Sequence, residues 1–188
     1  MTSFTEIDYD KPIIISKHNF SCDNEDTTIP EPLPRSSFSM LIIGKPGMGK
    51  TTLILSLLCK QGKAFNRKFD RVYLWSPSLI TMEEDPFELI PDEQKFDEAT
   101  FDNISDVLED IKDSGEKVLF VFNRRHLAGA GGSVSIIATS QAYNKIDAKL
   151  RKTASQIIFY KNLHKKETES LFDEVILLPK KEFVDTLR

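Results

Sequence analysis

Five short runs of apolar residues punctuate the chain, and each is unbroken or nearly so. Such runs are typical of β-strands that are covered on both faces, because a strand with one solvated face alternates apolar and polar residues. We therefore predict five buried strands, at residues 40–43, 71–76, 117–122, 133–141 and 156–160.

Other segments have the spacing of helices. The clearest is 102–113, where apolar residues recur every three or four positions and Gly115 ends the pattern. Strands that alternate with helices indicate an α/β fold, with a mainly parallel sheet and helices on both faces. The predicted helices span residues 53–58, 102–113, 168–178 and 180–187.

We divide the chain into an N-terminal extension, residues 1–38, and one domain, residues 39–188. The extension holds a candidate strand at 13–15 and then a polar, acidic stretch. Its prolines exclude a helix interior and favour an extended connector on the surface or toward a neighbouring subunit: Pro30, Pro32 and Pro34.

A phosphate-binding motif lies between the first predicted strand and the first predicted helix. Gly44, Gly49, Lys50 and Thr51 match G-x-x-x-x-G-K-[ST]. The glycines let backbone N–H groups turn toward the phosphates, the lysine reaches the terminal phosphates, and the threonine hydroxyl can ligate Mg²⁺. We predict a nucleoside triphosphate site with Thr51 as metal ligand, made of Gly44, Lys45, Pro46, Gly47, Met48, Gly49, Lys50, Thr51 and Thr52.

The composition narrows the class of protein. The 188 residues are 40% hydrophobic and 29% charged, as in a single globular domain. No apolar run approaches the roughly 20 residues of a membrane span, and the N-terminus has no signal-peptide pattern, so we expect an intracellular protein. Cys22 and Cys59 cannot build a disulfide framework, and three scattered histidines lack zinc-ligand spacing.

Charge is distributed unevenly around a net value of −4. Residues 1–122 hold 13 basic against 22 acidic side chains, a net −9, whereas residues 123–188 hold 12 against 7, a net +5. The basic part indicates either a polyanionic partner or a solvated basic face. Its central basic residues are Lys145, Lys149, Arg151, Lys152, Lys161, Lys165 and Lys166.

The order of motifs after the phosphate loop carries a family resemblance. An apolar strand leads to Asn-Arg-Arg-His at 123–126, a second strand at 135–141 ends in Gln, and Arg-Lys at 151–152 precedes a further strand. Over roughly residues 38–185 the chain resembles the genome-packaging ATPases of large eukaryotic double-stranded DNA viruses, in the FtsK–HerA group of P-loop NTPases. The resemblance implies a RecA/ASCE-like P-loop NTPase fold and an ATPase that pumps DNA.

The same resemblance assigns roles to individual residues. Lys50 and Thr51 would hold phosphate and Mg²⁺, and Gln141 would sense the γ-phosphate or the attacking water. Arg124 or Arg125 is a candidate arginine finger for a neighbour's ATP. Gln141 can also be read as a strand cap, and the arginines as structural or DNA-contacting residues. The implied partners are double-stranded DNA, further copies in a homo-oligomeric ring, and a capsid or portal-like component, in the host cytoplasm and the virion.

One departure from the family pattern follows Phe122. Family members continue this strand into an acidic pair, one carboxylate for Mg²⁺ and one to activate water, whereas this chain continues with Asn123 and Arg124. Glu116 cannot substitute, because it lies at the opposite end of the strand, roughly 20 Å away at about 3.3 Å per residue.

The next connection is short for the predicted fold. If strands 117–122 and 133–141 are parallel neighbours, their crossover needs about a dozen or more residues. Only ten, 123–132, are present. We therefore predict that a segment of about 20 residues carrying the acidic pair is absent from this sequence. The family also continues beyond Arg188 into a further strand, which predicts truncation or disorder there.

Three functions remain open at this point. The first is an ATP-driven motor that packages viral DNA. The second is a nucleotide-binding ring component that does not hydrolyse, which the missing carboxylates favour. The third is a P-loop kinase, which would need an arginine-rich lid segment after the middle of the sheet. The Ser-Gln pair that ends the strand at 133–141 is not a feature that a kinase would use.

Overall fold

A six-stranded parallel sheet forms the centre of the molecule. The computed structural model describes residues 29–34, 37–58, 64–77, 85–123, 134–161 and 164–175. The strand order is β3, β2, β4, β5, β1, β6, and every neighbouring pair is parallel. The strands are β1 (Ser39–Ile43), β2 (Arg71–Trp75), β3 (Lys95–Phe96), β4 (Val118–Asn123), β5 (Val134–Ser140) and β6 (Gln156–Phe159).

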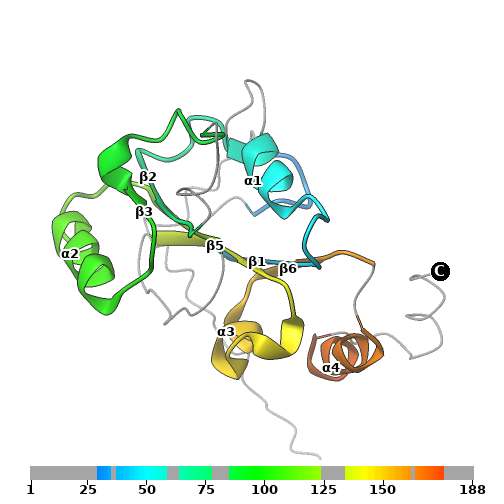
Figure 1. Ribbon diagram of the computed structural model, residues 1–188. Coiled ribbons are helices and arrows are strands. Elements are labelled where there is room, and N and C mark those ends of the chain that lie inside the picture. The colour runs from blue at the N-terminus through cyan, green and yellow to red at the C-terminus, as the bar shows by residue number, and fades with distance from the viewer. Residues whose placement is uncertain are drawn as a thin grey trace, which may run out of the picture.

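Helices pack on both faces of this sheet. Figure 1 shows α1 (Lys50–Leu58) on one side and both α3 (Ala148–Thr153) and α4 (Lys165–Val175) on the other. α2 (Phe101–Ile111) lies near the β3 and β2 end of the sheet, and η2 (Asp92–Gln94) and η3 (Tyr143–Lys145) are single 3₁₀ turns. The predicted α/β fold, a mainly parallel sheet with helices on both faces, is confirmed.

The apolar runs are continuous because each strand supplies two cores. In β4, Leu119 and Val121 pack in the core under α1 together with Ile54. Phe120 and Phe122 point into the opposite core, which α2 and α4 complete. These four side chains of β4 are all buried. Burying one such side chain contributes about 1.5–3 kcal/mol to stability relative to leaving it exposed.

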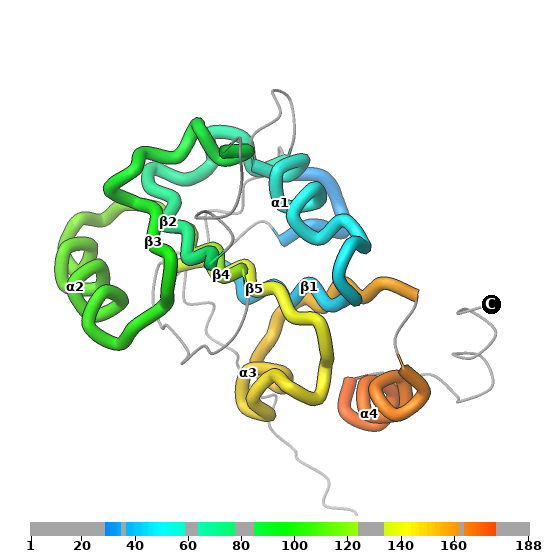
Figure 2. Tube along the Cα trace, in the orientation of Figure 1, coloured from blue at the N-terminus to red at the C-terminus, as the bar shows by residue number. Residues whose placement is uncertain are grey.

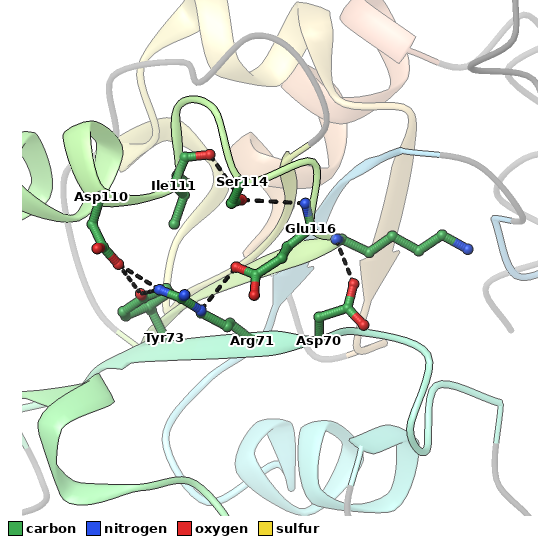
Figure 3. A network of polar contacts seen from close by, with 8 residues as sticks. Asp70, Arg71, Tyr73, Asp110, Ile111, Ser114 and Glu116 are labelled. Atoms are coloured by element: carbon green, nitrogen blue, oxygen red, sulfur yellow. Dashed lines mark hydrogen bonds and ion pairs between the residues drawn. The ribbon is translucent and has the colours of Figure 1, made fainter.

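The amino ends of β2 and β4 are joined by a network of charges (Figure 3). The Arg71 guanidinium pairs with the Asp110 carboxylate of α2, and its Nε lies 2.8 Å from Oε2 of Glu116. The backbone N–H of Lys117 donates to Asp70 at 2.8 Å. Glu116 therefore pairs with Arg71 at the edge of the sheet opposite the phosphate loop. This agrees with the prediction that Glu116 cannot replace the acidic pair.

Several sequence expectations are corrected. β3 and α3 were not predicted: β3 has two residues, and α3 has six and begins after Asp147, whose side chain accepts from the Lys149 N–H at 2.8 Å. Leu108, one of the apolar residues in the helix predicted at 102–113, is 36% exposed, so it lies at the margin of the helix's apolar face. The proline segment turns instead of extending, because the Leu33 N–H donates to the Pro30 carbonyl at 3.0 Å.

Other expectations lie outside the described residues. These include the candidate strand at 13–15, the end of the predicted helix at 168–178 beyond Val175, and the helix at 180–187. In the part of the chain that the structure describes, no helix is both long and apolar enough to cross a membrane.

Candidate functional site

The predicted phosphate loop joins the end of β1 to the start of α1. Figure 2 shows the chain leaving β1, bending through this loop and entering α1. Gly47 and Gly49 have φ values of 77° and 86°, which are costly for any residue with a Cβ atom. The Met48 N–H donates to the Lys45 carbonyl at 3.3 Å, and the Leu53 N–H donates to the Gly49 carbonyl at 2.9 Å. The two glycines therefore allow the chain to turn directly from strand into helix.

Lys50 is the first residue of α1, and its side chain folds back over the loop. Its Nζ donates to the carbonyl oxygens of Gly44 at 2.6 Å and of Lys45 at 2.9 Å. The ammonium group thus lies at the entrance of the loop, beside the positive end of the α1 dipole. Thr51 is half-buried in the first helical turn, and Thr52 is exposed. This arrangement presents an ammonium group, a hydroxyl and helix N–H groups to an anion.

Gln141 lies at the same edge of the sheet as the loop. β5 is the neighbour of β1, and the Gly44 N–H donates to the Ser140 carbonyl at 3.0 Å. The Ser140 hydroxyl donates to the Ala142 carbonyl at 2.8 Å and accepts from the Ala142 N–H at 3.3 Å, which fixes the backbone around Gln141. The exposed Gln141 therefore directly follows the residue that is bonded to the start of the loop.

A polar cluster occupies the carboxyl ends of β2, β4 and β5. The Asn123 side-chain amide donates to the Ser76 hydroxyl at 3.1 Å, and its carbonyl accepts from the Thr139 hydroxyl at 3.0 Å. Ser76 and Thr139 are 1% and 4% exposed. Asn123 is the last residue of β4. The predicted site residues did not include this cluster, although its strand-end positions were a usable signal.

These residues fit a magnesium ion only in part. Mg²⁺ in nucleotide sites is usually bound by one or two carboxylates together with phosphate oxygens and water. Thr51 supplies a hydroxyl in the first turn of α1. The residues that end or follow β2, β4 and β5 are Ser76, Asn123 and Ser140, and none of them carries a carboxylate. Among these three described residues the oxygen atoms that could bind Mg²⁺ are therefore neutral: two hydroxyls and the Asn123 amide oxygen.

The candidate arginine fingers, Arg124 and Arg125, lie outside the described residues. Their assignment as arginine fingers stays a prediction.

Of the seven basic residues singled out in the C-terminal part, Arg151 alone is not exposed. Arg151 Nη1 lies 2.9 Å from Oε1 of Glu174, and its guanidinium stacks 4.7 Å from the centre of the Tyr143 ring. The Tyr143 hydroxyl donates to Glu174 at 3.0 Å, and burial together with this bond raises the pKa of Tyr143 to about 12. Arg151 therefore ties α3 to α4, which corrects its place among the candidate DNA contacts. The remaining members are exposed: Lys145, Lys149, Lys152, Lys161, Lys165 and Lys166.

Two solved structures share this fold. They are complexes of the genome packaging NTPase B204 from Sulfolobus turreted icosahedral virus 2, one with AMPPCP and one with ATP-gammaS. Their TM-scores are both 0.51, at 10% and 9% sequence identity, and each match covers 80% of this chain and 86% of that chain. No protein-family model matches the chain, and no curated protein sequence does. Identities this low show the fold alone, which is that of an α/β P-loop NTPase.

Proposed function

We propose that this protein binds ATP with Mg²⁺ at the carboxyl edge of its sheet, and that hydrolysis drives double-stranded viral DNA into a capsid. The observation that carries the nucleotide site is the position of Lys50, whose ammonium lies over the loop at the start of α1. Ligands of parallel α/β sheets bind outside the carboxyl ends of the strands, which is where this loop lies. The packaging role rests on the order of motifs and on the fold shared with B204.

Each residue of the site has a role in this proposal. Backbone N–H groups of the loop and of the first turn of α1 orient the phosphates, the Lys50 ammonium neutralises charge on the β and γ phosphates, and the Thr51 hydroxyl would bind the metal. When Mg²⁺ is bound, it neutralises part of the negative charge of the phosphates. Gln141 orients the attacking water, and Arg124 or Arg125 from a neighbouring copy stabilises charge in the transition state.

The proposal includes an assembly. A finger supplied by a neighbour requires a homo-oligomeric ring, and a packaging motor needs a capsid or portal-like component to receive the DNA. The exposed lysines of η3, α3 and α4 would contact DNA phosphates, because a motor that passes any sequence cannot depend on bases. Such a motor acts in the host cytoplasm at the site of virus assembly, and in the virion.

A second candidate function is a nucleotide-binding ring component that does not hydrolyse. The observation in its favour is Asn123, a neutral residue at the end of β4, hydrogen-bonded to Ser76 and Thr139. A neutral amide cannot take a proton from water and is a weaker Mg²⁺ ligand than a carboxylate.

ATP turnover with and without double-stranded DNA separates these functions. The motor requires hydrolysis that DNA stimulates, the second candidate binds ATP without turnover, and a kinase transfers phosphate to a small acceptor. Lys50→Ala should abolish ATP binding or turnover, whereas Lys117→Ala removes the same charge at the opposite edge of the sheet and should change neither. Wild-type behaviour of Lys50→Ala would refute the phosphate-loop assignment.

A further inference from the structure

Gly44, the first residue of the phosphate loop, is held on three sides. Its N–H is bonded to β5 and its carbonyl to Lys50. On the third side lies Tyr160. A Cβ atom at position 44 would be 2.7 Å from Cδ2 of Tyr160, and 3.1 Å from both Cβ and Cγ of the same residue. No side chain therefore fits at position 44 unless the Tyr160 ring moves.

Position 44 requires glycine because there is no room for a side chain, and not because the backbone there has a positive φ. Among the described glycines, Gly47, Gly49 and Gly115 have positive φ values, and Gly44 does not. An alanine at position 44 meets no backbone strain of the kind that it would meet at Gly47 or Gly49. The clash with Tyr160 is what makes glycine necessary at this position.

Tyr160 is well placed to support the loop. It directly follows β6, and its N–H donates at 2.9 Å to the carbonyl of Ile43, the last residue of β1. Its half-buried side chain packs on the core under α1. A Cβ atom at Gly49 would lie 3.8 Å from the Tyr160 hydroxyl oxygen, which is an ordinary van der Waals distance. The Tyr160 side chain thus lies close against Gly44, and its hydroxyl end lies near Gly49.

We propose that Tyr160 is a positioning residue whose ring holds the phosphate loop in its nucleotide-binding conformation. The contact at Gly44 is made by ring and Cβ carbons, so the ring and not the hydroxyl carries the effect. This inference rests on the proposed function, since it names what maintains the affinity of the loop for ATP.

Three single variants test the role of the ring. Tyr160→Ala removes it, and Tyr160→Phe keeps it without the hydroxyl. Phe159→Ala is the matched control, because Phe159 is the preceding residue of β6 and packs on the opposite core. Melting temperature, the Kd for Mg²⁺ with ATP-gammaS, and amide hydrogen exchange of residues 44–50 without nucleotide are measured for each.

The expected pattern separates positioning from general destabilisation. Tyr160→Ala should weaken ATP-gammaS binding about tenfold and speed amide exchange in the loop, because the interaction free energy of residues in contact is large enough for such a change. The Kd of Tyr160→Phe should stay within about twofold of wild type. Phe159→Ala should lower the melting temperature and leave Kd and loop exchange unchanged. Equal effects of the two alanine variants on loop exchange, or none from Tyr160→Ala, would overturn the proposal.

A size exchange at the contact gives an independent test. Gly44→Ala should weaken binding because its Cβ collides with the ring, and adding Tyr160→Ala should relieve the collision. The double variant, Gly44→Ala with Tyr160→Ala, should bind ATP-gammaS at least about threefold more tightly than the product of the two single-variant effects on Kd predicts. Simple additivity would overturn the proposal. If wild type binds no nucleotide, the proposed function fails, whereas the nucleotide-free exchange still tests Tyr160.

Discussion

The Asn123→Asp substitution tests whether the carboxyl end of β4 faces the nucleotide. Aspartate has the shape of asparagine, so the Thr139 hydroxyl can still donate to it. The Ser76 hydroxyl, which now accepts from the amide at 3.1 Å, can rotate and donate instead. The change therefore adds one negative charge while both hydrogen bonds can be kept.

The expected gain is in affinity for magnesium and nucleotide together. Two unit charges about 4 Å apart attract by about 4 kcal/mol at an effective dielectric constant of about 20. Desolvation opposes this attraction, but a net gain of about 1.4 kcal/mol is already a tenfold change in affinity. We therefore expect Asn123→Asp to bind ATP-gammaS at least about tenfold more tightly with Mg²⁺ than wild type does, with little change when EDTA replaces Mg²⁺.

Titration calorimetry with Mg²⁺ and with EDTA measures this difference, and ATP turnover is recorded alongside. Asn144→Asp makes the same chemical change at an exposed position in η3 and should alter neither value. Asn123→Ala removes the hydrogen bonds to Ser76 and Thr139, and should lower the free energy of unfolding by about 1–3 kcal/mol. A folded Asn123→Asp protein with unchanged magnesium dependence would refute the placement of the metal beside β4.

Three further predictions address the ring, the DNA and the packing of α4. Arg124→Ala or Arg125→Ala should lower turnover by about 10³ with nearly unchanged nucleotide affinity, and mixing with Lys50→Ala subunits should restore activity at mixed interfaces; stable mixed rings without recovery would exclude a finger in trans. Affinity for duplex DNA should fall by about 0.9 log unit per log unit of salt for each phosphate contacted, whatever the sequence, and strong base preference or indifference to salt would exclude a translocase. Because the pKa of Tyr143 is raised to about 12, its contribution to stability is present below pH 10 and lost as the pH rises through 12. Tyr143→Phe should remove this loss, at most about 3 kcal/mol, from a denaturation series between pH 9 and 12, and identical pH profiles for the two proteins would contradict the assignment.

The strands were predictable because their side chains are buried on both faces. Each of the five predicted runs lies within one residue of an observed strand, and the parallel pairing of β4 with β5 is confirmed. β3 is a different case, since its two residues join the sheet only through their pairing with β2. That pairing is a tertiary interaction, which no local pattern of two residues specifies.

The site was predictable where its chemistry is local in sequence. The spacing from Gly44 to Thr51 specifies a loop, a lysine and a helix start within eight residues. Asn123 and Ser76 are 47 positions apart and meet only because β2 and β4 are neighbours in register. Tyr160 reaches Gly44 because β6 pairs with β1. Contacts of this kind depend on strand order, which the motif does not contain.

The confirmed pairing of β4 with β5 sets the distance that the connection between them must cover. Asn123 pairs with Thr139 and Val118 with Val134, so the chain must return from the carboxyl end of β4 to the amino end of β5. That return covers about 17 Å along the strands at about 3.3 Å per residue. Ten extended residues span at most about 36 Å, whereas ten helical residues advance only about 15 Å. Ten residues are therefore long enough for the return, and the absent segment stays a prediction that rests on the usual length of such crossovers, about a dozen or more residues. An intact mass of the protein from its natural source that equals 21.4 kDa would exclude such a segment and favour the non-hydrolysing function.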